Sequence, residues 1–358
     1  MKKILLAITL VFAATTATYA KKYIGIAMPE THVERWINDG KKLVSEAEAL
    51  EYKAAVQFGG GDQTTQNAQI SNFITQGVDL LIVGSINEGV NSVLEEAAEE
   101  GIEIISYDRL MTNTDLYNYY ITFDNYNVGA MQGLAIAKGL KLESVSPSKP
   151  KYITLFSGSP TDNNARFFFD GAYDVLKTYI KRGKLVVLGP NPDGSGDPTW
   201  SKITTEGWNA NIAQKRMDNL LSGATRNHRL DAILAPNDTI ARAIITSLKS
   251  DSKYDKFTPI VTGQDAEIDS VKSIIKGKQT MTVFKNTNTL AKKAIWLSDQ
   301  LLKGKKPTSM SGAVYDDKTY NTGKKLVKSF LLAPVTVTKA NYKKELLNSG
   351  FYTKKQLK

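Results

Sequence analysis

The sequence predicts an α/β protein with two Rossmann-like lobes, each built on a parallel sheet with helices on both faces. Strand-like and helical segments alternate along the chain, and the alternation starts again in the second half. The 358 residues also exceed the roughly 250–300 residues at which a single hydrophobic core stops growing. With 42% hydrophobic and 23% charged residues, the composition is typical of a folded globular protein.

The first 20 residues have the three regions of a secretory signal peptide. Lys2 and Lys3 precede an apolar run over residues 4–14, and small residues lead to Ala20. The run is shorter than the about 20 apolar residues that a membrane span needs. We expect cleavage after Ala20 and export to the periplasm, without a lipid anchor because no cysteine follows.

Short apolar runs in the first half predict strands over residues 23–28, 52–58, 79–85 and 102–107. Between them, apolar side chains recur at helical spacing. The first such segment places Val33, Trp36, Leu43 and Ala47 on one face. In the second half we expect strands over residues 152–158, 184–188, 232–235 and 260–262, and a long amphipathic helix over residues 165–180.

Composition excludes several classes of site. The chain has no cysteine and two histidines, so disulfides, thiolate catalysis and multi-histidine metal cages are out. It has no Walker motif and no dinucleotide fingerprint, and we expect no cofactor. The loop over residues 191–197 resembles a calcium loop, but Lys202 stands where such a loop needs an acid, so a turn-rich loop is the better interpretation.

The net charge of +10 falls to +8 when Lys2 and Lys3 are removed with the signal peptide. The remaining lysines are scattered among acids rather than gathered in one basic arm. This pattern is typical of a solvated surface, and we expect no nucleic-acid partner.

Polar side chains follow four predicted strands, where the ligand crevice of an open α/β sheet lies. Each one alone has an alternative explanation, because Asp and Asn also cap helices. Capping explains neither the doubled polar residues nor Arg109, although a buried Arg109 could instead pair with a neighbouring acid. Asp124 precedes a helix and is expected to be a cap. The strand-end residues are Asp108 with Arg109, Asp162 with Asn163 and Asn164, Asn237 with Asp238, and Gln264 with Asp265.

Two tryptophans accompany these polar residues. Trp36 belongs to an apolar stripe, so a core position explains it as well as ligand stacking does. Trp208 lies in a loop without such a stripe. A pyranose presents hydroxyls around an apolar C–H face, which suits charged donors and acceptors between aromatic plates. Paired carboxylates also leave a glycosidase open, although sequence gives no pair a known separation.

The mature chain resembles the periplasmic sugar-binding proteins of bacterial ABC importers, in the multiple-sugar (glucose/galactose) and xylose-binding branch. The resemblance covers nearly the whole mature sequence. It rests on Glu34-Arg35-Trp36, Ser106-Tyr107-Asp108-Arg109, Thr122-Phe123-Asp124-Asn125, the run from Gly158 to Ala165, Gly263-Gln264-Asp265-Ala266 and Thr280-Met281-Thr282-Val283-Phe284-Lys285.

The resemblance implies the type I fold of periplasmic binding proteins, with a hinge of three chain crossings at the strand-like segments over residues 119–123, 281–284 and 330–332. The expected first lobe comprises residues 21–124 and 283–330, and the second lobe residues 125–282 and 331–358. The family's sugar-binding positions fall on Arg35, Asp108, Arg109, Asp162, Asn164, Trp208, Asn237, Asp265 and Lys285, with Trp36 and Asp238 as adjacent candidates. No metal site is implied.

These expectations describe a monomeric solute-binding protein, not an enzyme, that captures an aldopyranose and delivers it to a membrane permease. Two alternatives stay open. The protein could present sugar to a chemoreceptor or sensor kinase, or it could process glycosides with two of the cleft carboxylates. The export signal and the missing DNA-binding headpiece disfavour a sugar-responsive repressor of the same fold.

Overall fold

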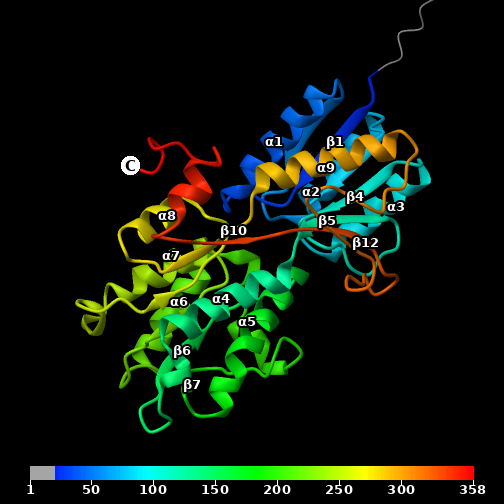
Figure 1. The fold of residues 1–358 in the computed structure, drawn as a ribbon. Coiled ribbons are helices and arrows are strands. Elements are labelled where there is room, and N and C mark those ends of the chain that lie inside the picture. The colour runs from blue at the N-terminus through cyan, green and yellow to red at the C-terminus, as the bar shows by residue number, and fades with distance from the viewer. Residues whose placement is uncertain (1–20) are drawn as a thin grey trace, which may run out of the picture.

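The computed structural model describes residues 21–358, so the expected signal peptide lies outside the described residues. The first lobe is built on a seven-stranded sheet with the order β11-β12-β5-β4-β3-β1-β2 (Figure 1). All neighbouring strands in it are parallel except β11 and β12. The strands are β1 (Tyr23–Met28), β2 (Lys53–Phe58), β3 (Leu80–Val83), β4 (Glu103–Tyr107), β5 (Tyr119–Phe123), β11 (Val314–Asp316) and β12 (Lys328–Leu332).

The apolar side chains along each strand of this sheet point alternately to its two faces. Leu80 and Ile82 of β3 belong to one hydrophobic cluster, whereas Leu81 and Val83 belong to another. This two-sided burial is expected of a parallel sheet with helices on both faces. Helices α1 (Arg35–Ala49) and α9 (Thr287–Leu302) cover the first face, and α2 (Gln63–Thr75) and α3 (Asn91–Glu99) the second.

The second lobe is built on a four-stranded parallel sheet with the order β7-β6-β8-β9. Its strands are β6 (Lys151–Leu155), β7 (Leu185–Val187), β8 (Ala232–Leu234) and β9 (Ile260–Val261). Its helices are α4 (Asn125–Gly139), α5 (Asn163–Lys181), α6 (Ala210–Ser222), α7 (Asp238–Leu248) and α8 (Ile268–Ile275). The expected α/β architecture is confirmed, and every expected strand is present with ends shifted by at most three residues.

Strands β10 (Met281–Phe284) and β13 (Val335–Thr338) form an antiparallel pair beside the second lobe, and Val283 also bridges to Gln264. The chain passes between the lobes after β5, between β10 and α9, and between β12 and β13 (Figure 1). The pairing places Val283 with the second lobe, and Leu331 with the first lobe opposite Thr122, unlike the expected boundaries. Strands β11 and β13 were not expected from the sequence.

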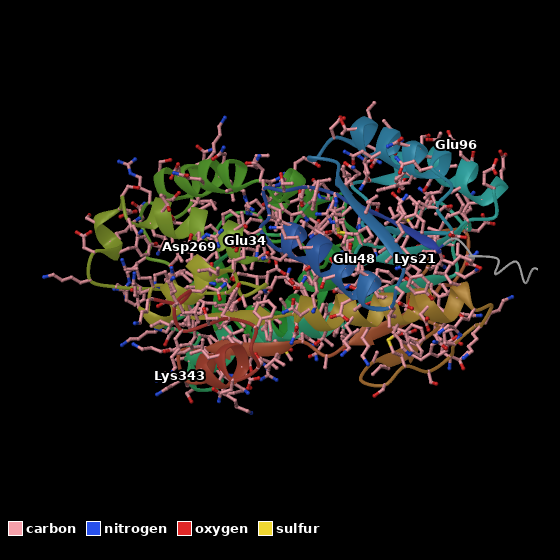
Figure 2. All side chains as sticks on the ribbon, turned by 90° about the horizontal axis from the view of Figure 1, so that it is seen from above. Lys21, Glu34, Glu48, Glu96, Asp269 and Lys343 are labelled. Atoms are coloured by element: carbon pink, nitrogen blue, oxygen red, sulfur yellow. The ribbon has the colours of Figure 1, made fainter. Side chains whose placement is uncertain are left out.

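Helix α1 runs with its first turn toward the second lobe. Figure 2 shows Glu34, just before α1, on the side of the helix that faces the second lobe, whereas Glu48 lies at the far end near Lys21. The direction matters because Arg35 is the first residue of α1. The start of the helix therefore carries this side chain to the junction of the lobes.

Candidate functional site

A narrow cavity lies at the junction of the lobes, largely filled by the side chains that line it. Ten of the eleven predicted site residues line it: Arg35, Trp36, Asp108, Arg109, Asp162, Asn164, Trp208, Asn237, Asp265 and Lys285. Nine of them are buried, and Asp265 is partly buried.

Arg35 lies among three carboxylates although only 6% of the residue is exposed. Its Nη2 is 2.9 Å from Asp108 Oδ2 and 2.8 Å from Asp39 Oδ2, and its Nη1 is 3.7 Å from Asp265 Oδ1. Burial alone would lower the pKa of Arg35, but the negative charges of Asp108, Asp39 and Asp265 raise it well above its usual value. The guanidinium also stacks 4.6 Å from the ring centroid of Trp36.

Two of the aspartates have a rare backbone conformation. Asp108 has φ +60° and Asp265 φ +92°, a region that side chains other than glycine rarely adopt. Such conformations persist only where surrounding contacts hold them, and they cluster at functional sites. The Asp108 N–H donates to Ile121 of β5 and the Asp265 N–H to Val283 of β10. Both carboxylates are therefore fixed by strands that lead into the lobe connections.

Asp108 and Asp265 each face a cation. Burial would raise the pKa of Asp108, but Arg35, Lys285 and Arg109 outweigh it and hold the pKa below its usual value. Lys285 Nζ is 3.0 Å from Asp265 Oδ1. Lys285 follows β10 directly, so this lysine enters the cavity from one of the three connections.

Arg109 both lines the cavity and forms the ion pair that we weighed as an alternative. Its Nη2 donates to Glu30 Oε1 (2.7 Å) within the first lobe, and its Nε is 3.2 Å from Asp162 Oδ2 of the second lobe. The guanidinium lies 5.0 Å from the Trp36 ring centroid. Trp36 therefore packs in the core and also contacts both arginines of the site.

Asp162 serves as a helix cap and as a wall of the cavity. Its Oδ1 accepts from the Asn164 N–H at the start of α5, and its Oδ2 accepts from Trp208 Nε1 (3.2 Å). Burial raises the pKa of Asp162 despite the nearby charge of Arg109. Trp208 fits because position 158, three residues after the end of β6, is glycine: a Cβ on Gly158 would lie 2.1 Å from the indole.

Asn164 connects the two lobes directly. Its Nδ2 donates to the Asp108 carbonyl (2.7 Å), and its Oδ1 accepts from Asn125 Nδ2 (2.8 Å). Asn237 caps α7 through the Ile240 N–H and also borders the cavity. Asp124 caps α4 through the Asn127 N–H, as expected.

Asp238 was predicted as an adjacent site residue, but it does not line the cavity. Its Oδ1 accepts from Gln279 Nε2, and its Oδ2 accepts from the Glu267 N–H and Thr282 Oγ1. Burial raises the pKa of Asp238 well above its usual value. The side chain is thus turned into the second lobe, where it braces the loop that carries Asp265.

Four lining residues were not predicted: Glu30, Val33, Phe168 and Gln264. Glu30 follows a strand, so the strand-end rule could have found it. Gln264 was recognised at a strand end beside Asp265 but was not taken as a site residue. Val33 and Phe168 look like core residues because they belong to apolar helical stripes, and only the fold brings them to the cavity.

Three further properties concern residues 21–358 alone. No cluster of three or more His, Asp or Glu side chains in this part of the chain is arranged to hold a metal ion. In the loop over residues 191–197, Ser195 donates to Asp170 and Asp197 caps the turn that follows. No helix between Lys21 and Lys358 combines the length and apolarity of a membrane span.

The chain is similar to known proteins over most of its length. The model of the periplasmic binding protein domain matches residues 24–306. The multiple sugar-binding periplasmic receptor ChvE of Rhizobium radiobacter is 43% identical over 97% of this chain and 95% of its own. The D-xylose-binding periplasmic protein of Escherichia coli is 35% identical over 100% of this chain and 99% of its own.

Solved structures agree with these relatives. An ABC transporter solute-binding protein from Clostridium phytofermentans with bound β-D-glucose superposes with a TM-score of 0.86 at 40% identity, covering 94% of this chain and 100% of its own. A carbohydrate transporter solute-binding protein from Chloroflexus aurantiacus in complex with D-glucose gives 0.82 at 32% identity, covering 94% and 98%. The chain therefore belongs to the periplasmic binding protein family, on its branch of sugar-binding receptors.

Proposed function

We propose that this protein binds an aldopyranose such as glucose, galactose or xylose in the cavity between its lobes and delivers it to the permease of an ABC transporter. The observation that carries the proposal is the composition of the cavity. Arginine, lysine and carboxylate side chains from both lobes converge there beside two tryptophans. Charged partners make hydrogen bonds to sugar hydroxyls about twice as strong as neutral partners do.

We propose roles for the lining residues by their chemistry. Arg35, Arg109 and Lys285 donate to sugar oxygens, and Asp108, Asp162 and Asp265 accept from hydroxyls. Asn164 and Asn237 do both, and Trp36 and Trp208 contact the C–H faces of the ring. Relatives named for multiple sugars, for xylose and for bound glucose support this class of ligand.

We propose that binding closes the lobes about the three connections. We propose that one lobe comprises residues 21–124 and 285–332 and the other residues 125–284 and 333–358, which the pairing of β10 with β13 and of β12 with β5 supports. A sugar that contacts both lobes has higher affinity for the closed state and shifts the population toward it. As a second function, we propose that a chemoreceptor or sensor kinase recognises the closed, sugar-bound protein.

We propose that residues 1–20 are removed on export and that the mature protein begins at Lys21 in the periplasm, as a monomer. Intact-mass measurement of exported protein checks the cleavage site. A mass that retains residues 1–20 would contradict it.

Titration calorimetry of the mature protein against D-glucose, D-galactose, D-xylose and D-ribose tests the proposal. We expect saturable binding of at least one aldopyranose, and no binding of any would refute it. The pKa shifts of Asp162 and Asp108 diverge, as in glycosidase acid and nucleophile pairs, so incubation with aryl glycosides is included. We expect the glycosides to be recovered intact. Sugar release that is lost on Asp108→Asn would support the enzymatic alternative.

A further inference from the structure

Asp39 is a buried carboxylate directly behind the cavity, and it does not line it. It is 0% exposed and lies one turn after Arg35 on α1. Its Oδ2 accepts from Arg35 Nη2 (2.8 Å) and from the Tyr107 hydroxyl (3.1 Å). A buried carboxylate is costly unless it is paired and hydrogen-bonded, so its position needs an explanation.

The contacts of Asp39 indicate that it acts on the Arg35 guanidinium. Arg35 Nη2 is shared between Asp39 at 2.8 Å and Asp108 at 2.9 Å. Two carboxylates on one nitrogen, with the Trp36 ring beside the guanidinium, fix the plane of the group. Nη1 is thereby directed toward Asp265 of the second lobe, at 3.7 Å. Nε has no hydrogen-bond partner among residues 21–358.

All the groups that fix this plane belong to the first lobe. Asp39 and Trp36 lie on α1, Tyr107 is the last residue of β4, and Asp108 follows it. The orientation of Arg35 therefore does not depend on contact with the second lobe. A long side chain that is already oriented loses less conformational entropy when it meets a ligand.

We propose that Asp39, supported by the Tyr107 hydroxyl, is a positioning residue that sets sugar affinity by orienting the Arg35 guanidinium before the ligand arrives. The inference rests on the proposed function. The competing explanation is that Asp39 only stabilises the packing of α1 on the sheet. The two explanations predict different effects of an Asp39 substitution once Arg35 is replaced by lysine, which has no planar group to orient.

A double-mutant cycle with D-glucose, or the best-bound aldose of the panel, separates them by titration calorimetry. Asp39→Asn should weaken binding roughly tenfold, as expected when one charged hydrogen bond is lost. Lysine has a point charge without a plane, so in an Arg35→Lys background Asp39→Asn should cause no further loss. Ser298→Ala is the matched control, because Ser298 is buried on the neighbouring helix α9 and bonds only within that helix.

Tyr107→Phe is the second variant, because it removes one hydroxyl and keeps the ring if Asp39→Asn fails to fold. We expect it to weaken binding a few-fold and to lose this effect in the Arg35→Lys background. Equal losses in both backgrounds, or a lower melting temperature with unchanged affinity, would overturn the inference. If the wild-type protein binds no sugar, the proposed function fails instead. If the wild-type protein binds sugar but only Arg35→Lys weakens binding, the inference about Asp39 fails while the proposed function stands.

Discussion

Replacing Gly158 with alanine should damage sugar binding by displacing Trp208. A Cβ at position 158 would lie 2.1, 2.3 and 2.6 Å from three carbons of the indole, whereas ordinary contacts begin near 3.4 Å. The ring must therefore move by about 1.3 Å, the difference between 3.4 and 2.1 Å. Trp208 Nε1 donates to Asp162 Oδ2 at 3.2 Å, and a shift of this size breaks that bond.

This bond joins two groups of the protein, so its loss costs about 1.5–3 kcal/mol of folding stability. Sugar affinity should fall roughly tenfold, equivalent to about 1.4 kcal/mol, because the displaced indole also leaves its place against the sugar. Calorimetric titration of Gly158→Ala with the best-bound aldose measures it. Gly196→Ala is the control, because a Cβ at Gly196 meets no atom within 4 Å. If Gly158→Ala binds sugar as tightly as the wild type, the position of the Trp208 indole does not determine sugar affinity.

Three further predictions concern charge and closure. Arg109→Lys should weaken sugar binding roughly tenfold to hundredfold because an ammonium lacks the planar fork. The melting temperature of the ligand-free protein should change little because the charge facing Glu30 is kept. If calorimetry shows normal affinity and thermal melts show lower stability, Arg109 is a purely structural partner. His32 Nε2 lies 2.9 Å from both Glu30 and the Gly207 carbonyl of the other lobe, and the hydrogen bond with Glu30 raises the pKa of His32. Its stabilising contribution should be complete below about pH 6.5 and be lost as pH rises through the raised pKa, so melts between roughly pH 5.5 and 8.5 should show a decline that His32→Gln flattens. Small-angle scattering should show a smaller radius of gyration with saturating sugar, and an unchanged radius would argue against closure.

Much of the fold could be predicted because most of its strands are short and mainly apolar. The run over residues 23–28 is β1 without any shift, since every residue of it is buried. Strand β13 could not be predicted in the same way. Its Val-Thr-Val-Thr run is only four residues long and pairs with β10, more than fifty residues earlier in the chain. Only the folded chain reveals such a long-range partner.

The candidate site was predictable where strand ends place side chains in it. Asp108, Asp162 and Asp265 follow this rule, and so does Glu30, which we missed. Asp238 shows the limit of the rule. It adjoins Asn237, but the start of α7 turns the two side chains in different directions. Sequence adjacency cannot tell which of two polar neighbours faces a cavity and which supports a loop.

The route of the chain between the lobes also has a consequence for folding order. Strand β12 inserts between β11 and β5, so Lys328 pairs with Tyr119 across most of the chain. The second lobe likewise receives β13 only near the C-terminus. Neither lobe is a continuous piece of sequence: the first lobe is incomplete until β12 is made, and the second until β13 is made. A chain shortened before β12 would leave β5 with an unpaired edge, which is a site for aggregation. Long-range pairing of this kind is slow to form, so we expect both lobes to be completed late, after residues 328–338 have been made.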